Sequence, residues 1–259
     1  MASHDSQQIF NAFRDWWREQ SHAKGTWAAS SLLLRELWDF VRDSTPERRR
    51  SRFGDMEYDW EHKVNTTSGT VGWRLRLLGV FHSAYQPTEE AAFRQMMAAL
   101  PIDFPQFTFI DIGSGKGRVL LMASEYPFRR IIGVELMSSL HLVAKENIAA
   151  YQTKKITALS THSRDANSQP QIPIESVCVD ARQFVFPTTP LVFYLFHPLL
   201  ESGLRQLLLN LENSHTQAPR PIWIVYHNPV LEHVLAESPF LVKIGGKPEY
   251  SIFRSPAIE

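Results

Sequence analysis

Residues 107–121, Phe-Thr-Phe-Ile-Asp-Ile-Gly-Ser-Gly-Lys-Gly-Arg-Val-Leu-Leu, constrain the fold most because their hydrophobic period changes in the middle. Before Asp111 the pattern is typical of a buried strand, and after Gly117 it is typical of a helix. A strand that turns through glycines into a helix directs several backbone N–H groups, and the positive end of the helix dipole, at one spot. We therefore expect a ligand to bind at this turn.

The glycine spacing narrows the chemistry of that ligand. Glycines stand at 113, 115 and 117, and Arg118 occupies the place where the dinucleotide fingerprint G-x-G-x-x-G requires its last glycine. Asp111 stands two residues before the first glycine. A carboxylate there repels a pyrophosphate but accepts hydrogen bonds from an ammonium group. A tight turn with no ligand is the alternative reading of the same residues.

The order of the predicted elements indicates the fold class. Apolar strands alternate with amphipathic helices from residue 107 onward, and the chain closes on two strand-like runs at 241–244 and 250–254, separated by Gly245 and Gly246. This predicts an α/β fold with a doubly wound, mostly parallel seven-stranded sheet and a C-terminal antiparallel hairpin. Amphipathic runs at 7–20 and 28–41 predict an N-terminal helical extension. We expect a helical segment over 1–84, which covers the acceptor side, and a ligand-binding domain over 85–259.

A second acid supports a nucleoside site. The run Arg130-Ile-Ile-Gly-Val-Glu135 ends in a carboxylate 20 residues after Gly115, where this architecture places its ribose ligand. Glu135 is therefore the predicted ribose ligand, with a solvated acid at a strand end as the alternative. This spacing is shared with folds that bind nicotinamide dinucleotides, so the glycine spacing has to distinguish the cofactors.

Taken together, D-x-G-x-G-x-G at 111–117 resembles motif I of the class I S-adenosylmethionine (SAM) dependent methyltransferases, and the resemblance extends over roughly residues 85–254. The run 111–119 followed by Gly-Val-Glu at 133–135 is similar to the histone-lysine branch of that fold. The resemblance implies SAM as cofactor. The residues it implies as cofactor ligands are Asp111, Gly113, Ser114, Gly115, Gly117, Glu135, Asp180, Ala181 and Phe196.

Within this resemblance, Asp180 follows the third predicted strand, where a family acid binds the adenine amino group; a helix N-cap is the alternative. The run Phe196-His197-Pro198 resembles motif IV of amino-methylating enzymes, which usually carry Asn or Asp where this chain has His197. His197 is thus a candidate general base or a structural histidine. Tyr85 is the second catalytic candidate, since a tyrosine-proline turn lies over the sulfonium in related enzymes. Thr88 belongs to the same turn, or caps the helix that follows.

Composition limits the class of protein. Lys plus Arg equals Asp plus Glu, 27 each, so net charge gives no reason to expect nucleic acid as a partner. The one cysteine, Cys178, excludes an intramolecular disulfide and lies in an apolar run, where we expect it to be buried. No apolar stretch is long enough to span a membrane, so we expect a cytoplasmic protein. His227 and His233 lack a third ligand, so we expect no metal.

The sequence therefore predicts a SAM-dependent methyltransferase whose acceptor is a nitrogen of a protein or small molecule. A catalytically silent SAM-binding or scaffolding protein stays open, because binding motifs do not require a catalytic residue. A nicotinamide-dependent oxidoreductase is disfavoured by Arg118 and by the terminal hairpin. A nucleic-acid methyltransferase would need a basic surface, and a salt-dependent gel shift would reveal one. The oligomeric state is not indicated.

Overall fold

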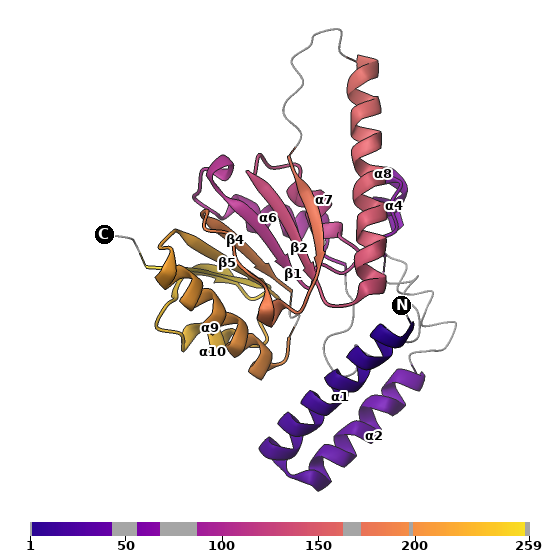
Figure 1. Ribbon diagram of the computed structural model, residues 1–259, viewed down its shortest axis with the longest axis vertical. Helices are drawn as coiled ribbons and strands as arrows, with labels where there is room; N and C mark the ends of the chain where they lie inside the picture. Colours follow the sequence, from indigo (N-terminus) through magenta and orange to yellow (C-terminus); the bar gives the residue numbers. More distant parts are fainter. Residues whose placement is uncertain (1, 43–55, 68–86, 163–171, 197–198, 257–259) are drawn as a thin grey trace.

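The computed structural model describes residues 2–42, 56–67, 87–162, 172–196 and 199–256 (Figure 1). Within them, one sheet has the strand order β3-β2-β1-β4-β5-β7-β6. Its strands are β1 (Thr108–Ile112), β2 (Arg130–Glu135), β3 (Ile174–Cys178), β4 (Leu191–Leu195), β5 (Ile222–His227), β6 (Val242–Lys247) and β7 (Tyr250–Arg254).

Six strands of this sheet run in one direction. β1 to β5 pair in parallel, β7 runs antiparallel to β5, and β6 runs antiparallel to β7. The chain moves outward from β1 through β2 to β3 and then returns to the other side of β1 with β4, so the strand order reverses between β1 and β4. Ligands of such sheets bind at the carboxyl ends beside this reversal. The predicted fold class is confirmed.

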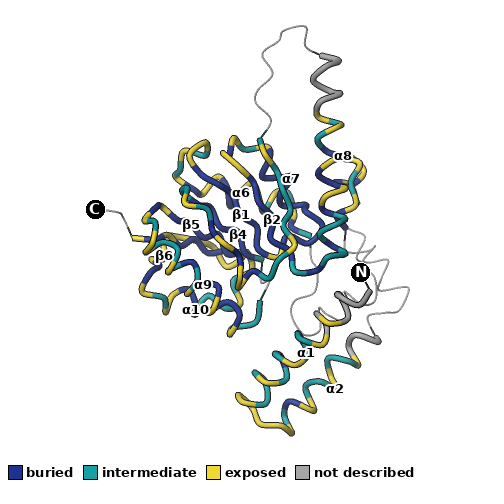
Figure 2. Tube along the Cα trace, in the orientation of Figure 1, coloured by how far each residue is buried: buried dark blue, intermediate teal, exposed yellow. Residues whose placement is uncertain are grey.

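Helices cover both faces of the sheet (Figure 1). One face packs against α6 (Glu90–Ala98), α7 (Arg118–Ala123) and α8 (Ser138–His162), and the other against α9 (Glu201–Gln217) and α10 (Glu232–Ala236). Two short 3-10 turns, η2 (Phe104–Gln106) and η3 (Ala181–Gln183), precede β1 and follow β3. Because both faces are covered, the central strands do not alternate between buried and exposed residues, and every residue of β1 and β4 is buried, including the polar Thr108 and Asp111 of β1 (Figure 2).

The N-terminal segment is mostly helical where it is described. α1 (Ala2–Lys24) and α2 (Thr26–Arg42) lie side by side and join at Gly25, whose φ of +83° is a left-handed conformation that suits glycine (Figure 1). A short helix, α4 (Met56–His62), follows. Both predicted amphipathic helices are present and extend beyond their predicted bounds. None of the helices in the described ranges is long and apolar enough to cross a bilayer.

Three local expectations are wrong. Gly245 and Gly246 lie inside β6 and the turn falls at 248–249, because Gly246 has a φ of +145° and runs so close to β7 that a Cβ would lie 2.5 Å from the Tyr250 carbonyl oxygen. Thr88 is not a helix cap, since Glu89 holds the N-cap position of α6. Cys178 is exposed, because it ends β3, the outermost strand of the sheet.

Candidate functional site

The glycine loop between β1 and α7 has the backbone geometry that its sequence predicts. Gly113, Gly115 and Gly117 have φ values of +76°, +54° and +84°, all in the left-handed region. The N–H groups of Gly113 and Ser114 donate to the Val134 carbonyl at 2.8 and 3.1 Å, which ties the loop to the end of β2. The loop is thus held at the carboxyl ends of β1 and β2, the strands that carry the predicted ligand-binding residues Asp111 and Glu135.

A glycine in β2 makes room for this loop. A Cβ on Gly133 would lie 2.6 Å from both Ser114 Oγ and Leu120 Cδ1, a distance that real Cβ atoms do not show. Ser114 is 6% exposed, and its hydroxyl has no hydrogen-bond partner within the described residues. Gly133 is a site residue that the sequence analysis did not select, although it stands in the Gly-Val-Glu run that we had noted.

Glu135 ends β2 and supports the loop directly. Its Oε2 accepts a 2.8 Å bond from the Gly115 N–H, and its Oε1 accepts one of 2.8 Å from the Met137 N–H. The side chain is buried, and burial raises its pKa while the backbone N–H groups partly offset that rise. Each carboxylate oxygen has a second lone pair, so Glu135 can hold the loop and still accept hydroxyl groups from a ligand.

Asp111 is a buried acid of the site. It is 3% exposed, and its carboxylate has no hydrogen bond or ion pair to any residue in the described ranges. Burial and the nearby charge of Glu135 raise the pKa of Asp111 well above its usual value. A buried acid next to a second buried acid is stabilised by a positively charged ligand. The site therefore suits a cation and disfavours a pyrophosphate.

A polar segment after α4 is fixed against the glycine loop. Asp59 accepts 2.7 and 2.9 Å bonds from the N–H groups of Thr66 and Thr67, and a short bond from the Thr66 hydroxyl. Lys116 Nζ donates to the Thr67 carbonyl at 2.8 Å and to Asn65 Oδ1 at 3.2 Å. Burial lowers the pKa of Lys116 to about 8. Segment 59–67 therefore packs against the glycine loop through Lys116.

Asn147 of α8 connects the same two segments. It accepts a 2.8 Å bond from the Asn65 N–H and donates to the carbonyls of Asn65 and Lys116 at 3.0 and 2.9 Å. Segment 59–67 belongs to the region 1–84 that was expected to cover the acceptor side, and that role stays a prediction. Its hydrogen bonds reach Lys116 of the glycine loop and Asn147 and Lys154 of α8. The sequence signal was a polar run, Asn65-Thr66-Thr67, with too few apolar residues to enter a core, together with a lysine inside a glycine loop.

Asp180 lies at the carboxyl end of β3 and acts as a cap. It accepts a 2.9 Å bond from the Arg182 N–H at the start of η3, and it forms an ion pair of 2.6 Å with the Arg182 guanidinium. The N-cap alternative is thus what the structure shows. Arg182 also reaches Asp15 of α1 at 3.7 Å, and Ala181 is buried.

Aromatic and polar side chains gather at the ends of β4 and β5. Tyr194 OH is 2.9 Å from Thr88 Oγ1 and 2.8 Å from His227 Nδ1. The rings of Phe196 and His227 stack with centroids 4.0 Å apart. Neither His227 nor Tyr194 was selected from the sequence. The two catalytic candidates, His197 and Tyr85, lie outside the described residues.

The first helix crosses three of the strand ends. Trp16 of α1 is 5% exposed and packs with Met137 and Leu140, which follow β2. Ser202, after β4, donates a 2.7 Å bond to Glu19 of α1, and Asp15 pairs with the residue Arg182 after β3. α1 thus contacts the segments that follow β2, β3 and β4.

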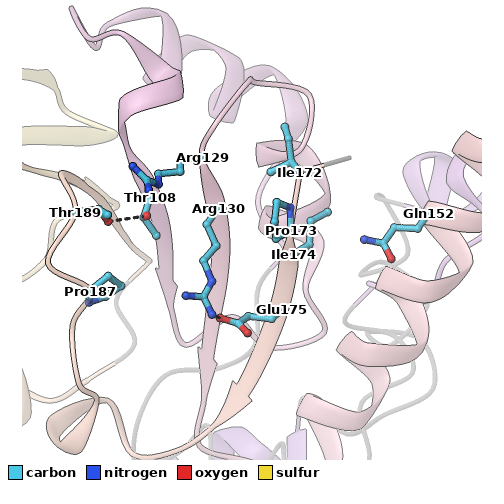
Figure 3. A pocket seen from close by; sticks show the side chains of 10 residues that line it. All are labelled: Thr108, Arg129, Arg130, Gln152, Ile172, Pro173, Ile174, Glu175, Pro187 and Thr189. Atoms are coloured by element: carbon cyan, nitrogen blue, oxygen red, sulfur yellow. Dashed lines mark hydrogen bonds and ion pairs between the residues drawn. The ribbon is translucent and has the colours of Figure 1, made fainter. Parts of the chain in front are cut away.

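A cleft of about 660 Å³ lies at the opposite edge of the sheet, at the amino ends of the strands (Figure 3). Its lining residues include an ion pair of 2.5 Å between Arg130 and Glu175 and a 2.8 Å contact between the hydroxyls of Thr108 and Thr189. Its lining residues are Thr108, Arg129, Arg130, Gln152, Ile172, Pro173, Ile174, Glu175, Pro187 and Thr189. None of these is a predicted site residue, and strand ends of this polarity do not carry ligands in doubly wound sheets.

No protein-family model matches the sequence, and no curated protein does. Solved structures with a similar fold include the ribosomal protein L11 methylase of Lactobacillus delbrueckii subsp. bulgaricus, at 16% identity and TM-score 0.40, covering 63% of this chain and 76% of that one. TrmN of Thermus thermophilus has 18% identity and TM-score 0.38, covering 64% of this chain and 47% of TrmN, so this chain spans about half its length.

A third is an RNA methyltransferase of Salinibacter ruber in complex with S-adenosyl-L-homocysteine, at 15% identity and TM-score 0.37, covering 66% of this chain and 92% of that one. The first of these is named a methylase and the third a methyltransferase, and the identities and TM-scores of all three are low. None of the three concerns the histone-lysine branch, and that narrower resemblance stays a prediction.

Proposed function

We propose that this protein binds SAM across the carboxyl ends of β1 and β2 and transfers its methyl group to an acceptor bound at the ends of β4 and β5. The observation that carries the proposal is Asp111, a buried carboxylate without a partner in the described chain, next to the buried Glu135. SAM offers such a pair an ammonium group, a sulfonium and two ribose hydroxyls. A nicotinamide dinucleotide would bring a pyrophosphate to two buried acids, which repel it.

The proposed ligand contacts follow from the position of each residue. Asp111 would face the ammonium group, Glu135 would accept the ribose hydroxyls, and the glycines at 113, 115 and 117 would allow the backbone close to the ligand. Asp180 and Ala181 would lie by the adenine, as the resemblance implies. Asp180 would then have to share its carboxylate with Arg182.

The chemistry supplied by bound SAM is a methyl group on a positively charged sulfur that leaves as a neutral thioether. The residues of this chain would hold the cofactor and the acceptor in line and exclude water, since positioning alone can account for much of the rate of such a transfer. α1, which contacts the segments after β2, β3 and β4, is placed to exclude water. The narrower proposals are a nitrogen acceptor on a protein or small molecule, held near Phe196, and catalytic roles for His197 and Tyr85.

Calorimetric titration with SAM and S-adenosylhomocysteine tests the proposal. We expect micromolar-range binding of both, weakened about 10- to 100-fold by Asp111→Asn, because the variant loses a charge-assisted hydrogen bond. Asp103→Asn is the matched control, since it makes the same change at an exposed acid, and it should leave both affinities unchanged. No binding of either ligand to the wild type would refute the proposal, and binding of NADH instead would favour the oxidoreductase.

A catalytically silent SAM-binding protein is the second candidate, because the features described at β1 and β2 concern binding alone. A screen of protein and small-molecule acceptors with methyl-labelled SAM separates the two. Label transfer that Asp111→Asn reduces favours the enzyme. Tight binding with no transfer to any acceptor favours the binding protein.

A further inference from the structure

Three hydrogen-bonding side chains from three elements form a chain at the carboxyl ends of β4 and β5. Thr88 precedes α6, Tyr194 lies in β4 and His227 ends β5. Thr88 Oγ1 and Tyr194 OH are 2.9 Å apart, and Tyr194 OH and His227 Nδ1 are 2.8 Å apart. Both hydroxyls are buried, with Thr88 2% and Tyr194 0% exposed. The direction of donation along these two hydrogen bonds decides whether His227 offers a ligand a hydrogen-bond donor or an acceptor.

The burial of Thr88 fixes that direction. Tyr194 is the one hydrogen-bond partner of the Thr88 hydroxyl in the described ranges. If Thr88 donates to Tyr194, then Tyr194 donates to His227 Nδ1 and every proton has an acceptor. In the reverse order the Thr88 proton is buried without an acceptor, which costs about 1–3 kcal/mol. The first order, in which every proton has an acceptor, makes Nδ1 of His227 an acceptor. The proton of the neutral imidazole is therefore on Nε2.

The protonation states agree with this order. Burial raises the pKa of Tyr194 well above its usual value, so its hydroxyl keeps the proton that it donates. Burial lowers the pKa of His227 to about 4, so the ring is neutral at pH 7. In the part of the chain that the structure describes, two further titratable groups lie on neighbouring strands: Tyr250, which pairs with His227 across β5 and β7, and Asp111 on β1.

The second ring nitrogen of His227, Nε2, is the one that a ligand would meet. His227 is half-buried, and its Nε2 has no hydrogen-bond partner among the residues that the structure describes. The Phe196 ring stacks on it with an interplanar angle of 26°. Phe196 follows β4, two residues after Tyr194, and Tyr194 is in register with Asp111. The donor and its aromatic neighbour therefore lie on the β4 side of the point where the strand order reverses.

We propose that the Nε2–H of His227 is a fixed, uncharged hydrogen-bond donor that selects the methyl acceptor, and that the acceptor presents a carbonyl oxygen beside the Phe196 ring. This inference rests on the proposed function, since it concerns the second substrate of the same site. An amide and a carbonyl-bearing nucleobase share the required chemistry. An acceptor that presents only an ammonium group does not fit, because His227 has no lone pair left to receive it. For the same reason His227 does not take a proton from the acceptor.

The tautomer can be measured without any cofactor or substrate. In the full-length protein labelled with ¹⁵N-histidine, long-range ¹H–¹⁵N spectra at pH 7 should show His227 with a protonated Nε2 and an unprotonated Nδ1; His227→Gln identifies the signal. Tyr194→Phe removes the donor to Nδ1 and should give a mixture of tautomers. A wild-type His227 that carries its proton on Nδ1, or on both nitrogens, would overturn the inference.

Three small probes test the selection: benzamide for an amide source, 1-methyluracil for a nucleobase source and benzylamine for a cation. In protein saturated with S-adenosylhomocysteine, benzamide or 1-methyluracil should shift the His227 Nε2 signal and benzylamine should not. The probe that shifts it at the lower concentration identifies the source. His227→Phe should weaken that probe about fivefold, the value of one neutral hydrogen bond. His233→Phe, at an exposed histidine of α10, is the control and should change nothing.

The outcomes separate this inference from the proposed function. A shift by benzylamine alone, or by none of the three probes, overturns the donor role of His227 even where S-adenosylhomocysteine binds. If S-adenosylhomocysteine does not bind, the proposed function fails, and the tautomer and the same probe titration on the free protein still decide whether His227 is a donor for carbonyl groups.

Discussion

Asp111 is proposed to bind the ligand, but in the ligand-free protein its burial lowers the free energy of unfolding. Its folded pKa is raised, so between the unfolded value of 3.8 and the raised folded value the native state binds more protons than the unfolded state. The free energy of unfolding of the wild type therefore falls as pH rises through that window. A ligand cation would reverse this cost, so binding of SAM should release a proton from Asp111 at pH values inside the window.

Asp111→Asn should accordingly stabilise the ligand-free protein at pH 8, by about 1–3 kcal/mol, because an uncompensated buried charge becomes a neutral amide. The gain should vanish below pH 3.8, where the wild-type carboxyl is protonated in both states. Urea unfolding at several pH values measures it. A variant less stable than the wild type at pH 8 would show that the carboxylate is compensated in the folded protein.

Gly133→Ala should damage the site through packing alone. The new Cβ would meet Ser114 Oγ and Leu120 Cδ1 at 2.6 Å, so the glycine loop has to shift. We expect a loss of about 1–3 kcal/mol in the free energy of unfolding, together with weaker SAM binding. Gly203→Ala in α9 is the matched control, because its nearest contact would be an ordinary 3.5 Å and the position is helical. Equal effects of the two substitutions would contradict the packing explanation.

At the scale of elements, segment 59–67 depends on one carboxylate. Asp59→Ala removes the acceptor for the Thr66 and Thr67 N–H groups and for the Thr66 hydroxyl. Bonds to a charged group contribute about 1.5–3 kcal/mol, so we expect a loss of that size and faster amide exchange at both threonines. Glu57→Ala, at an exposed acid of the same helix α4, should leave these amides protected. Exchange that stays slow in Asp59→Ala would mean that Lys116 and Asn147 suffice to hold the segment.

The elements and the backbone geometry of the glycine loop could be predicted because their signals are local. A strand, three glycines and a helix follow one another within residues 107–121, and Glu135 stands at a fixed distance beyond them. The contacts of Thr88 could not be predicted, since its partner Tyr194 is 106 residues away and local pattern made it a plausible cap. Lys116 and Thr67 are likewise 49 residues apart. Pairings of this kind depend on the three-dimensional fold and leave no periodic signal.

The Gly245-Gly246 pair shows the opposite error, in which a local signal misled. Two adjacent glycines usually mark a turn, but here they allow β6 to approach β7 at an irregular register between Lys243 and Gly245. Local sequence was also ambiguous at Asp180, where it was compatible both with a helix N-cap and with a residue that binds adenine. The structure shows the cap, because the Arg182 N–H lies 2.9 Å from its Oδ1.

At the scale of the whole molecule, the N-terminal helices and the sheet meet where the ligand is proposed to bind. α1 contacts the segments after β2, β3 and β4, whereas α2 contacts chiefly α1 (Figure 1). The helix pair also exposes large apolar side chains, with Trp27 86% and Trp38 67% exposed. The junction is small, so its stability depends mainly on Trp16, the largest buried side chain of α1.

Trp16→Ala should detach α1 from the strand ends while the sheet stays folded. Truncating a buried tryptophan costs about 3–5 kcal/mol, and we expect that loss to exceed the free energy that holds α1 on the strand ends. The two large hydrophobic clusters of the sheet do not include Trp16, so the sheet should stay folded. Amide exchange should therefore accelerate throughout α1 and stay slow in β1 and β4. Trp27→Ala, at an exposed position of α2, is the control and should change neither region.

The same variant decides whether α1 belongs to the cofactor site. If α1 covers bound SAM, Trp16→Ala should weaken SAM at least about tenfold, and SAM added to the wild type should slow amide exchange in α1, because binding and docking then stabilise each other. If exchange in α1 accelerates while the SAM affinity is unchanged, the helix docks on the strand ends without covering the cofactor, and its exposed tryptophans become the better guide to its role.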